Sequence, residues 1–471
     1  MLRYILEMTR MQVKVNLKFN HFLYVLGLIG LLSLFHCKKE AVPEAYKPTN
    51  SHEAYIHSLR MADLAHTALG RDWILASEAA LREPVEIETP YEEAFYVDQA
   101  AAFATAYRFE VKRGQRTEID VEFQGQRRCR LFMDLFRVQG STIEDWKLVA
   151  SANEKEKHLE FEPRSDAQYV VRLQPELLRG GRFSVVIRTV ATLEFPVAGH
   201  DSGSIGSGFG APRDGGRRKH HGVDIFAPRH THVQAPSKAY VRHVGESDRG
   251  GRNIWLYDSK RLLYLYFAHL QSQDVIEGTY VEARQKIGTV GNTGNARRTP
   301  PHLHFGIYAQ GEGPVDPYNY IKKINSVPED IKADLEMLGR WVRSKDQRIS
   351  LRASLESGSQ QMTQLDRHST MKVLAAASNM YRVHLPDGIS GYVSAQGVEL
   401  AEEILEFRQT DQLQVVMDSP MEHAVIMEQI GTGEEFSVLG QFEGFWLVQT
   451  NQGIVGWLPV SAGESTPSSN R

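Results

Sequence analysis

Five residues in three separate parts of the chain have side chains that could bind a metal ion or move a proton. His220 and Asp224 lie in one short segment, His269 follows an apolar run, and His302 and His304 are separated by a single residue. Two imidazoles and a carboxylate form a usual ligand set for catalytic zinc, which keeps its fourth position open for water. Water activated in that way attacks carbonyl groups, so these residue types favour metal-assisted hydrolysis.

The spacing selects between neighbouring histidines if both segments are strands. Side chains two residues apart in a strand lie on the same face, so His302 and His304 point the same way. By the same parity His220 and Asp224 share a face, while His221 points away from it. We therefore predict that His220, rather than its neighbour, is the ligand from this segment.

A His-x-His pair alone is weak evidence for a metal site. With 18 histidines among 471 residues the pattern is expected about once by chance, and a second copy, His230 and His232, is indeed present. That second pair is interpreted as surface or core histidines that take no part in the site. The prediction therefore depends on the combination of motifs and on their order along the chain.

Three segments occur in an order that resembles a known family. They read HHGVDIFAP at residues 220–228, YFAHL at residues 266–270 and GTVGNTGNARRTPPHLHFGIY at residues 288–308. Together they resemble the LytM/lysostaphin-type zinc metallopeptidases, peptidase family M23, over residues 198–322. The resemblance implies a β-sheet peptidase domain over that range.

The resemblance also implies a role for each candidate residue. In that family the histidine of His-x-x-x-Asp, its aspartate and the second histidine of His-x-His bind Zn²⁺, which here are His220, Asp224 and His304. The other two, His269 and His302, line the site as catalytic residues. One would accept the proton of the attacking water and the other would stabilise the tetrahedral intermediate. Which residue takes which role is left open.

Two loops depart from the family pattern. Residues 229–231 read Arg-His-Thr where the family often has a glycine before the threonine, and residues 299–301 read Thr-Pro-Pro where a glycine often precedes the proline. Neither change removes a ligand, whereas inactive relatives typically lack one. The chain has no His-Glu-x-x-His motif, so a general base of the thermolysin type is not expected.

Basic residues gather just before the first candidate ligand. They could hold carboxylates of a substrate, or they could belong to a solvated loop. These residues are Arg213, Arg217, Arg218 and Lys219.

Composition places the chain among globular proteins with several domains. Its length suggests about three domains, and its 42% of hydrophobic and 24% of charged residues are ordinary values. The formal net charge of −4 gives no reason to expect nucleic acid as a partner. The only cysteines, Cys37 and Cys129, exclude a disulfide scaffold and an all-cysteine zinc site.

The N-terminus has the features of an export signal. Basic residues precede an uncharged run from Phe22 to Phe35, which is shorter than the roughly 20 residues of a bilayer span. We predict a lipoprotein-type signal peptide over residues 1–36 and a lipid anchor on Cys37, which would place the protein in the cell envelope, facing the periplasm on the outer membrane. A signal anchor in the inner membrane is the alternative. Residues 37–84 are expected to form a tether and a helical segment.

Strands are expected in much of the remaining chain. Alternation with a period of two, interrupted by glycine turns, predicts an antiparallel β-sandwich accessory domain over residues 85–192. A helical linker is expected over residues 323–345, because Pro328 stands in the first turn of a helical pattern that continues to Val342.

The C-terminal part contains an internal repeat. Two hydrophobic strands joined by a glycine turn at residues 380–393 recur 65 residues later. The repeats resemble small bacterial SH3-like barrels over residues 346–402 and 407–462, followed by a disordered tail at residues 463–471. The expected fold class is therefore mainly β and multidomain, with short helical segments.

These features lead to one functional expectation and several alternatives. A zinc metalloendopeptidase that hydrolyses peptide cross-links fits an exported, lipid-anchored chain, whose expected partners are peptidoglycan and the membrane but not nucleic acid. D-Ala–diaminopimelate bridges and glycine bridges are both possible substrates within this class. The alternatives are a non-catalytic protein that binds the wall or activates an amidase, and a general secreted protease.

Overall fold

The structure, a computed structural model, describes residues 47–460 apart from residues 126, 127, 154, 357 and 422. The predicted signal peptide, the candidate anchor Cys37 and the predicted tail lie outside the described residues. Among the described residues, no helix is both long and apolar enough to cross a membrane.

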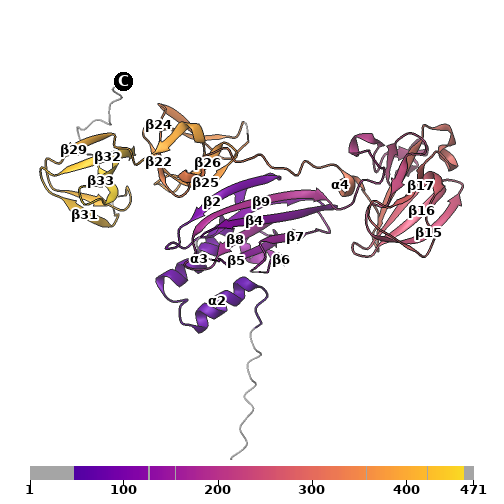
Figure 1. Ribbon diagram of the computed structural model, residues 1–471, viewed down its shortest axis with the longest axis horizontal. Coiled ribbons are helices and arrows are strands. Elements are labelled where there is room, and N and C mark those ends of the chain that lie inside the picture. Colours follow the sequence, from indigo (N-terminus) through magenta and orange to yellow (C-terminus); the bar gives the residue numbers. More distant parts are fainter. Residues whose placement is uncertain (1–46, 126–127, 154, 357, 422, 461–471) are drawn as a thin grey trace, which may run out of the picture. The chain divides into compact units, whose positions relative to one another are not determined.

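The described residues from Tyr55 onward belong to the larger of two compact units. Strands predominate in the larger unit and belong to several sheets, which confirms the prediction of a mainly β, multidomain chain (Figure 1). The α-helices are α2 (Ser51–Met61), α3 (Ala68–Arg82) and α4 (Tyr318–Ile321). The 3-10 turns are η1 (Ile143–Asp145), η2 (Ser202–Ser204), η3 (Asp214–Gly216), η4 (Gly294–Arg298), η5 (Leu335–Met337) and η6 (Ala395–Gly397).

Helix α3 is fixed to the sandwich that follows it. The Thr67 side chain caps the helix by accepting a hydrogen bond from the Gly70 amide, and the buried Trp73 indole donates to the Pro175 carbonyl at 2.8 Å. Because Trp73 also packs against Phe132, this helix covers the accessory domain.

Two layers, antiparallel except for the short parallel pair β1–β3, form the accessory domain. Its strands are β1 (Val85–Glu86), β2 (Tyr91–Val97), β3 (Thr105–Val111), β4 (Gln115–Gln124), β5 (Leu131–Arg137), β6 (Lys147–Ser151), β7 (His158–Phe161), β8 (Ala167–Pro175) and β9 (Gly181–Ala191). One sheet has the order β1-β3-β8-β5-β6, and the other includes β2-β9-β4-β7. Alternate residues of β4 are buried, since a strand with one face in a core shows this period of two.

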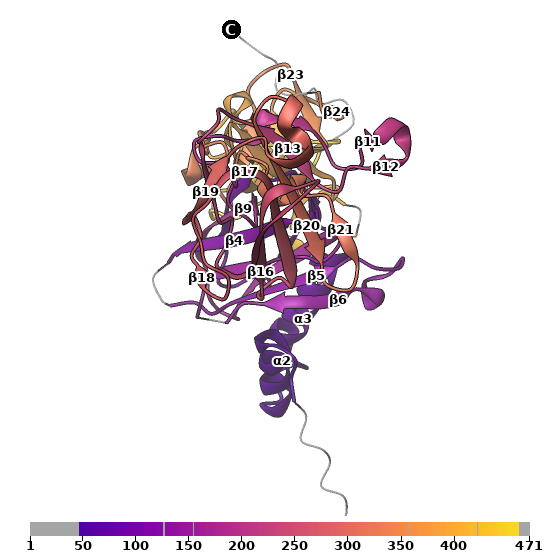
Figure 2. The same ribbon diagram turned by 90° about the vertical axis from the view of Figure 1, so that its right-hand side faces the viewer.

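A separate sheet supports the candidate site. Its order is β10-β13-β20-β17-β16-β15-β18, with β14 and β19 paired beside it and β21 paired to β20, while β11 and β12 form a hairpin of their own (Figure 2). The bounds are β10 (Ile205–Ser207), β11 (Pro212–Arg213), β12 (Arg218–Lys219), β13 (Val223–Phe226), β14 (His232–Gln234), β15 (Ala239–Ser247), β16 (Gly251–Asp258), β17 (Leu263–Gln273), β18 (Tyr280–Val281), β19 (Lys286–Val290), β20 (His302–Ala309) and β21 (Gly313–Val315).

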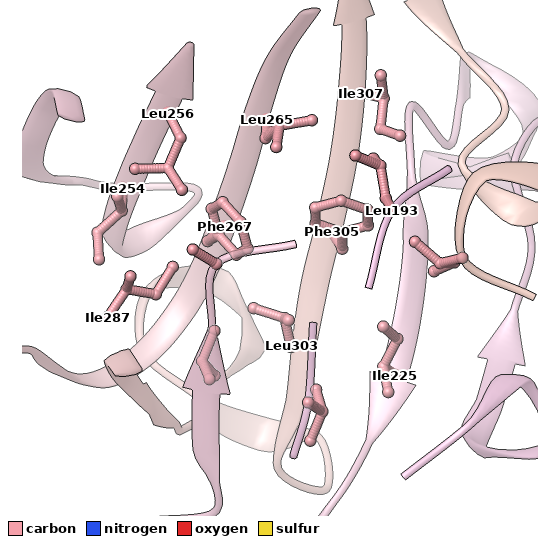
Figure 3. Packing of buried hydrophobic residues seen from close by; sticks show 14 of the residues in the cluster. Leu193, Ile225, Ile254, Leu256, Leu265, Phe267, Ile287, Leu303, Phe305 and Ile307 are labelled. Atoms are coloured by element: carbon pink, nitrogen blue, oxygen red, sulfur yellow. The ribbon is translucent and has the colours of Figure 1, made fainter. Parts of the chain in front are cut away.

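One face of this sheet is packed into a hydrophobic core. Leu265, Phe267, Leu303 and Phe305 are fully buried there (Figure 3). Because β17 and β20 bury one face in this way, their alternate residues lie on the other face, and that face holds the candidate site.

The C-terminal repeat predicted from the sequence is present as matching strands 65 residues apart. The first copy comprises β22 (Trp341–Ser344), β23 (Arg348–Arg352), β24 (Gln361–Asp366), β25 (Thr370–Ala377), β26 (Met380–His384), β27 (Ser390–Ser394) and β28 (Val398–Leu400). The second comprises β29 (Glu406–Gln409), β30 (Gln414–Met417), β31 (Ile426–Ile430), β32 (Glu435–Phe442), β33 (Phe445–Thr450) and β34 (Val455–Pro459). That these are SH3-like barrels stays a prediction.

The first repeat is not a free-standing unit. Strand β25 pairs with β2 of the accessory domain, and Arg382 donates to the fully buried Glu93 at 2.8 Å. Tyr107 also donates to Glu93, so the buried carboxylate has two partners. The sequence did not indicate this shared sheet, because single-strand patterns do not specify which edge a strand joins.

The helix predicted from Pro328 to Val342 was wrong. Residues 328–334 are irregular, Leu335–Met337 is a 3-10 turn, and β22 begins at Trp341. Strand β22 hydrogen-bonds to β25 and β28 and buries Val342 completely, which outweighs helix propensity. Gly339, with φ of +77°, turns the chain into that strand.

Candidate metal centre

Strand pairing brings two of the candidate ligands side by side. In the antiparallel pair β13–β20, Asp224 is directly opposite His304, and in the pair β17–β20, Ala268 is opposite the same histidine. Residues directly opposite each other in neighbouring strands have their side chains on the same face. The small Ala268 leaves room on that face beside His304.

The three candidate ligand atoms converge on one point. His220 Nε2 lies 2.9 Å from His304 Nδ1 and 3.1 Å from Asp224 Oδ1, and His304 Nδ1 lies 3.0 Å from the same oxygen. Tetrahedral ligands about 2.0–2.1 Å from a zinc ion stand roughly 3.3 Å apart, so a small adjustment would admit the ion. Among the described residues, these three form the group that could hold a metal.

His220 reaches the site by a route that differs from the predicted one. The parity argument assumed a strand through residues 220–224, but β13 begins only at Val223. The chain turns at Gly222, where an added Cβ would lie 2.5 Å from the Phe305 carbonyl oxygen. The turn buries His220 and leaves His221 exposed. The predicted histidine is therefore the buried one, but a turn rather than strand parity places it there.

Partners outside the cluster orient the ligands. His220 Nδ1 donates to the Gly208 carbonyl at 2.9 Å, which leaves Nε2 with the lone pair that a metal needs. Arg213 Nη2 donates to Asp224 Oδ2 at 2.7 Å and to Ser207 Oγ at 2.7 Å. Arg213 is therefore occupied with a ligand, and the structure gives no support for its holding a substrate carboxylate.

The environment keeps the Asp224 carboxylate ionised. Burial would raise the pKa of Asp224, but hydrogen bonds and charge from His220 and His304 hold that pKa well below its usual range. Burial lowers the pKa of His304 and outweighs the opposing effect of Asp224. An ionised carboxylate and neutral imidazoles are the protonation states in which these groups bind metals.

The two candidate catalytic histidines lie beside this cluster. Their ring centroids are 5.0 Å apart, and the His269 ring is 6.1 Å from that of His304. His269 Nδ1 donates to the Thr293 carbonyl and His302 Nδ1 to the Pro300 carbonyl, both at 2.9 Å. Burial lowers the pKa of His269 to about 4, with further contributions from its histidine neighbours.

Backbone conformation is unusual at His269 and in the loop that faces it. His269 has φ of +63°, a left-handed conformation that costs energy for a residue with a Cβ. The glycine-rich segment approaches it closely, since an added Cβ on Gly291 would lie 2.8 Å from the His269 carbonyl oxygen. Gly294, with φ of +68°, would meet the Gly251 amide at 2.3 Å. These glycines let Thr293 place its carbonyl on the His269 ring.

The sequence did not identify several residues that support the site. For Arg213 a substrate carboxylate and a solvated loop were both left open, and its bond to Asp224 was not foreseen; Gly208, Thr293 and Pro300 contribute only backbone carbonyls. The glycine-rich segment was the one signal that pointed to a close backbone approach, although it did not indicate which ring it would meet.

Comparison with protein families agrees with this geometry. Residues 218–317 match the model of the family described as "Peptidase family M23". This region is therefore similar to the peptidase domain of the M23 family. The match begins at β12 and ends just before α4, so it includes all five candidate residues.

Three curated proteins are similar to this domain. The L-Ala–D-Glu endopeptidase of Bacillus subtilis (strain 168) is 37% identical over 118 residues, which are 23% of this chain and 36% of that protein. Lysostaphin of Staphylococcus staphylolyticus is 40% identical over 87 residues, 18% of each chain. The uncharacterized lipoprotein YgeR of Escherichia coli (strain K12) is 34% identical over 116 residues, 25% of this chain and 43% of the relative. The match thus spans less than half of each relative.

Proposed function

We propose that the chain is a zinc-dependent endopeptidase that hydrolyses peptide cross-links of peptidoglycan in the cell envelope. The observation that carries the proposal is the convergence of His220, Asp224 and His304 within 2.9–3.1 Å of one another. A structural zinc site would close the fourth position with another side chain, whereas the described part of the M23 domain offers three ligands and two histidines beside them. One relative is named an endopeptidase, which is consistent with this assignment.

Zinc bound at this cluster would supply an acidified water and polarise the scissile carbonyl. The neighbouring histidines of the chain would accept and donate the protons. Because Nδ1 of both His269 and His302 donates to a backbone carbonyl, the neutral form of either ring carries its lone pair on Nε2. That atom can take the proton of the attacking water and pass it to the leaving amine, while the other ring, when protonated, can donate to the oxyanion.

The remaining parts of the chain fit an enzyme held at the wall. We propose that Cys37 carries a lipid, that the signal peptide is residues 1–36, and that the mature chain faces the periplasm. One relative is named a lipoprotein, which supports this location. The C-terminal repeats would serve as wall-binding modules. Metabolic labelling with a clickable fatty acid tests the anchor, because Cys37→Ala should abolish labelling.

Zymography on purified peptidoglycan tests the activity. We expect the full chain to clear the gel, and we expect clearing to disappear with a chelator and with His304→Ala. Mass spectrometry of the released muropeptides identifies the bond that is cut. Wall binding without release of muropeptides would instead favour the non-catalytic alternative. No feature of the described residues supports that alternative, since every candidate ligand is in place.

A further inference from the structure

The outer face of the M23 sheet continues beyond the metal cluster. On β20, the residues that share a face with His304 are Gly306 and Tyr308, and their partners on β17 are Tyr266 and Tyr264. The pairing is regular from Leu263 to Ala268, so no bulge moves these side chains to the other face. The same surface therefore carries the candidate ligands at one end and tyrosines at the other.

Strand β16 extends this surface with further aromatic residues. Trp255 is opposite Tyr266, and Tyr257 is opposite Tyr264. The aromatic face comprises Trp255, Tyr257, Tyr264, Tyr266 and Tyr308, all of which are partly exposed.

Three rings of the aromatic face form a group that begins at the metal cluster, and the other two form a separate pair. The Tyr266 ring is 5.8 Å from His304, and Trp255 is 4.4 Å from Tyr266 and 5.2 Å from Tyr308. Tyr257 and Tyr264 form a further pair at 4.9 Å. A molecule lying on this face would pass directly to the candidate metal site.

The composition of this face indicates the kind of molecule that it suits. The solvent face of an antiparallel sheet is usually polar, so five aromatic residues on such a face are unusual. Cross-strand aromatic pairs stabilise the sheet, which accounts for part of this aromatic content. None of the five residues is aliphatic, and each ring is only partly buried. Tyrosine and tryptophan combine a flat apolar ring with a polar edge. Sugar rings present the matching surfaces, with flat C–H faces and hydroxyl rims.

The hydroxyl groups of the face are available as hydrogen-bond donors. Burial raises the pKa of Tyr308, against the opposing charge of Arg218, and burial likewise raises the pKa of Tyr266 against Arg249. Both hydroxyls thus stay protonated at neutral pH and can donate hydrogen bonds. Arg218 is also paired with Asp214, whereas Arg249 is exposed.

Dimensions connect this face to the proposed reaction. Four residues of β20 separate His304 from Tyr308, a distance of about 13 Å. An extended peptide covers the same distance in about four residues. In peptidoglycan a stem peptide of that order of length joins the cross-link to the glycan. We propose that the aromatic face binds pyranose rings of the glycan strand whose stem peptide occupies the metal site, which rests on the proposed function above.

Substrates with and without sugars test this inference. The double variant Tyr257→Ser/Tyr264→Ser alters the end of the face far from the metal cluster. We expect it to lower kcat/KM about tenfold for a cross-linked muropeptide dimer that carries its disaccharides, because two stacking surfaces are lost. On the same cross-linked peptide without sugars its kcat/KM should stay within about twofold of wild type. Tyr318→Ser, which removes an exposed tyrosine of the same domain outside this face, is the matched control.

Direct titration with peptide-free glycan strands separates this inference from the proposed function. Wild type should bind the strands more tightly than the double variant, and the single variant Tyr308→Ser serves if the double variant does not fold. Equal losses on both peptide substrates, or no loss on either, would overturn the glycan site while leaving the endopeptidase intact. If wild type cleaves neither substrate, the proposed function fails, and the titration alone decides the inference: no binding of glycan strands overturns it.

Discussion

The two His-x-His segments of the chain have the same spacing and opposite surroundings. In strand β20, His302 is buried and His304 stands 3.0 Å from the carboxylate of Asp224. His230 and His232 are both exposed, and neither belongs to the group of described residues that could hold a metal. Identical sequence patterns therefore lead to a candidate metal centre in one place and to an exposed turn and strand end in the other.

Pairing across the sheet makes the difference. The residue opposite His304 is Asp224, whereas the residue opposite His232 is Thr289. His230 is not in a strand at all, because its φ of +71° places it in a turn. Spacing alone thus makes two imidazoles available, and a ligand set requires a carboxylate that the neighbouring strand supplies.

Removal of His304 is the strongest test of this contrast. We expect His304→Ala to lose bound zinc and to lower the rate of muropeptide release by about three orders of magnitude or more, because two ligands would remain. Metal analysis of the purified protein and a release assay measure the two effects. Retention of one zinc per chain together with near-normal activity would show that the two segments do not differ in the proposed way.

Substitution of the other buried histidines should separate metal binding from proton transfer. We expect His269→Gln and His302→Gln each to keep zinc and to lower kcat by about 10²–10⁴, the range for loss of a general acid or base. The amide can still donate to the carbonyl that holds each ring but cannot transfer a proton. Loss of zinc in either variant would instead assign that residue to the ligand set.

The sequence predicted which residues come together better than the path of the chain that brings them there. The parity of β20 correctly placed His302 and His304 in one strand on one face. For His220 the choice over His221 agrees with burial, but a glycine turn rather than a strand produces it. Patterns of single residues identify faces, whereas the path of an irregular loop depends on contacts that form only when the sheet has assembled.

The same limit explains the errors elsewhere in the chain. Helix propensity at residues 328–342 was overruled by the hydrogen bonds of β22, and the pairing of β2 with β25 had no local signal. The repeat, in contrast, was predicted with its offset, because each copy contains its own hairpin of neighbouring strands. Local pairings were therefore readable from the sequence and long-range pairings were not.

Substitution of Arg213 tests whether a residue outside the ligand set contributes to the affinity for zinc. It holds the oxygen of Asp224 that does not face the two histidines, so Arg213→Ala should weaken zinc binding by about 10–100-fold, as loss of an outer partner typically does. Competition with a chromophoric chelator measures the affinity. Arg217→Ala on the same hairpin is the control, since Arg217 donates to the backbone of Asp214 and should leave the affinity unchanged. Equal affinities of both variants and wild type would contradict the proposed role.

Burial at the site should also make stability depend on pH. The pKa of His269 is about 4 in the folded chain and about 6.5 when unfolded, so between these values the unfolded chain binds more protons. Stability should therefore fall as pH falls, by about 2 kcal/mol between pH 7 and pH 5 from this residue. Urea unfolding of the metal-free protein measures it, and His269→Gln should show a correspondingly smaller pH dependence. An equal dependence in both proteins would contradict the assignment.

The smallest expected effect is a change in the free energy of unfolding at the exposed segment that contains His230 and His232. Substitution by glycine should stabilise the chain at the first histidine and destabilise it at the second. His230 adopts a left-handed φ at a position where the M23 pattern often has glycine, so His230→Gly should stabilise the chain by a few tenths to about 1 kcal/mol. His232 is extended and paired with Thr289, so His232→Gly should destabilise by roughly 0.5–1 kcal/mol. Neither variant should change zinc content or muropeptide release. Loss of zinc from either variant would place this segment in the metal centre. The two His-x-His segments would then no longer differ in metal binding.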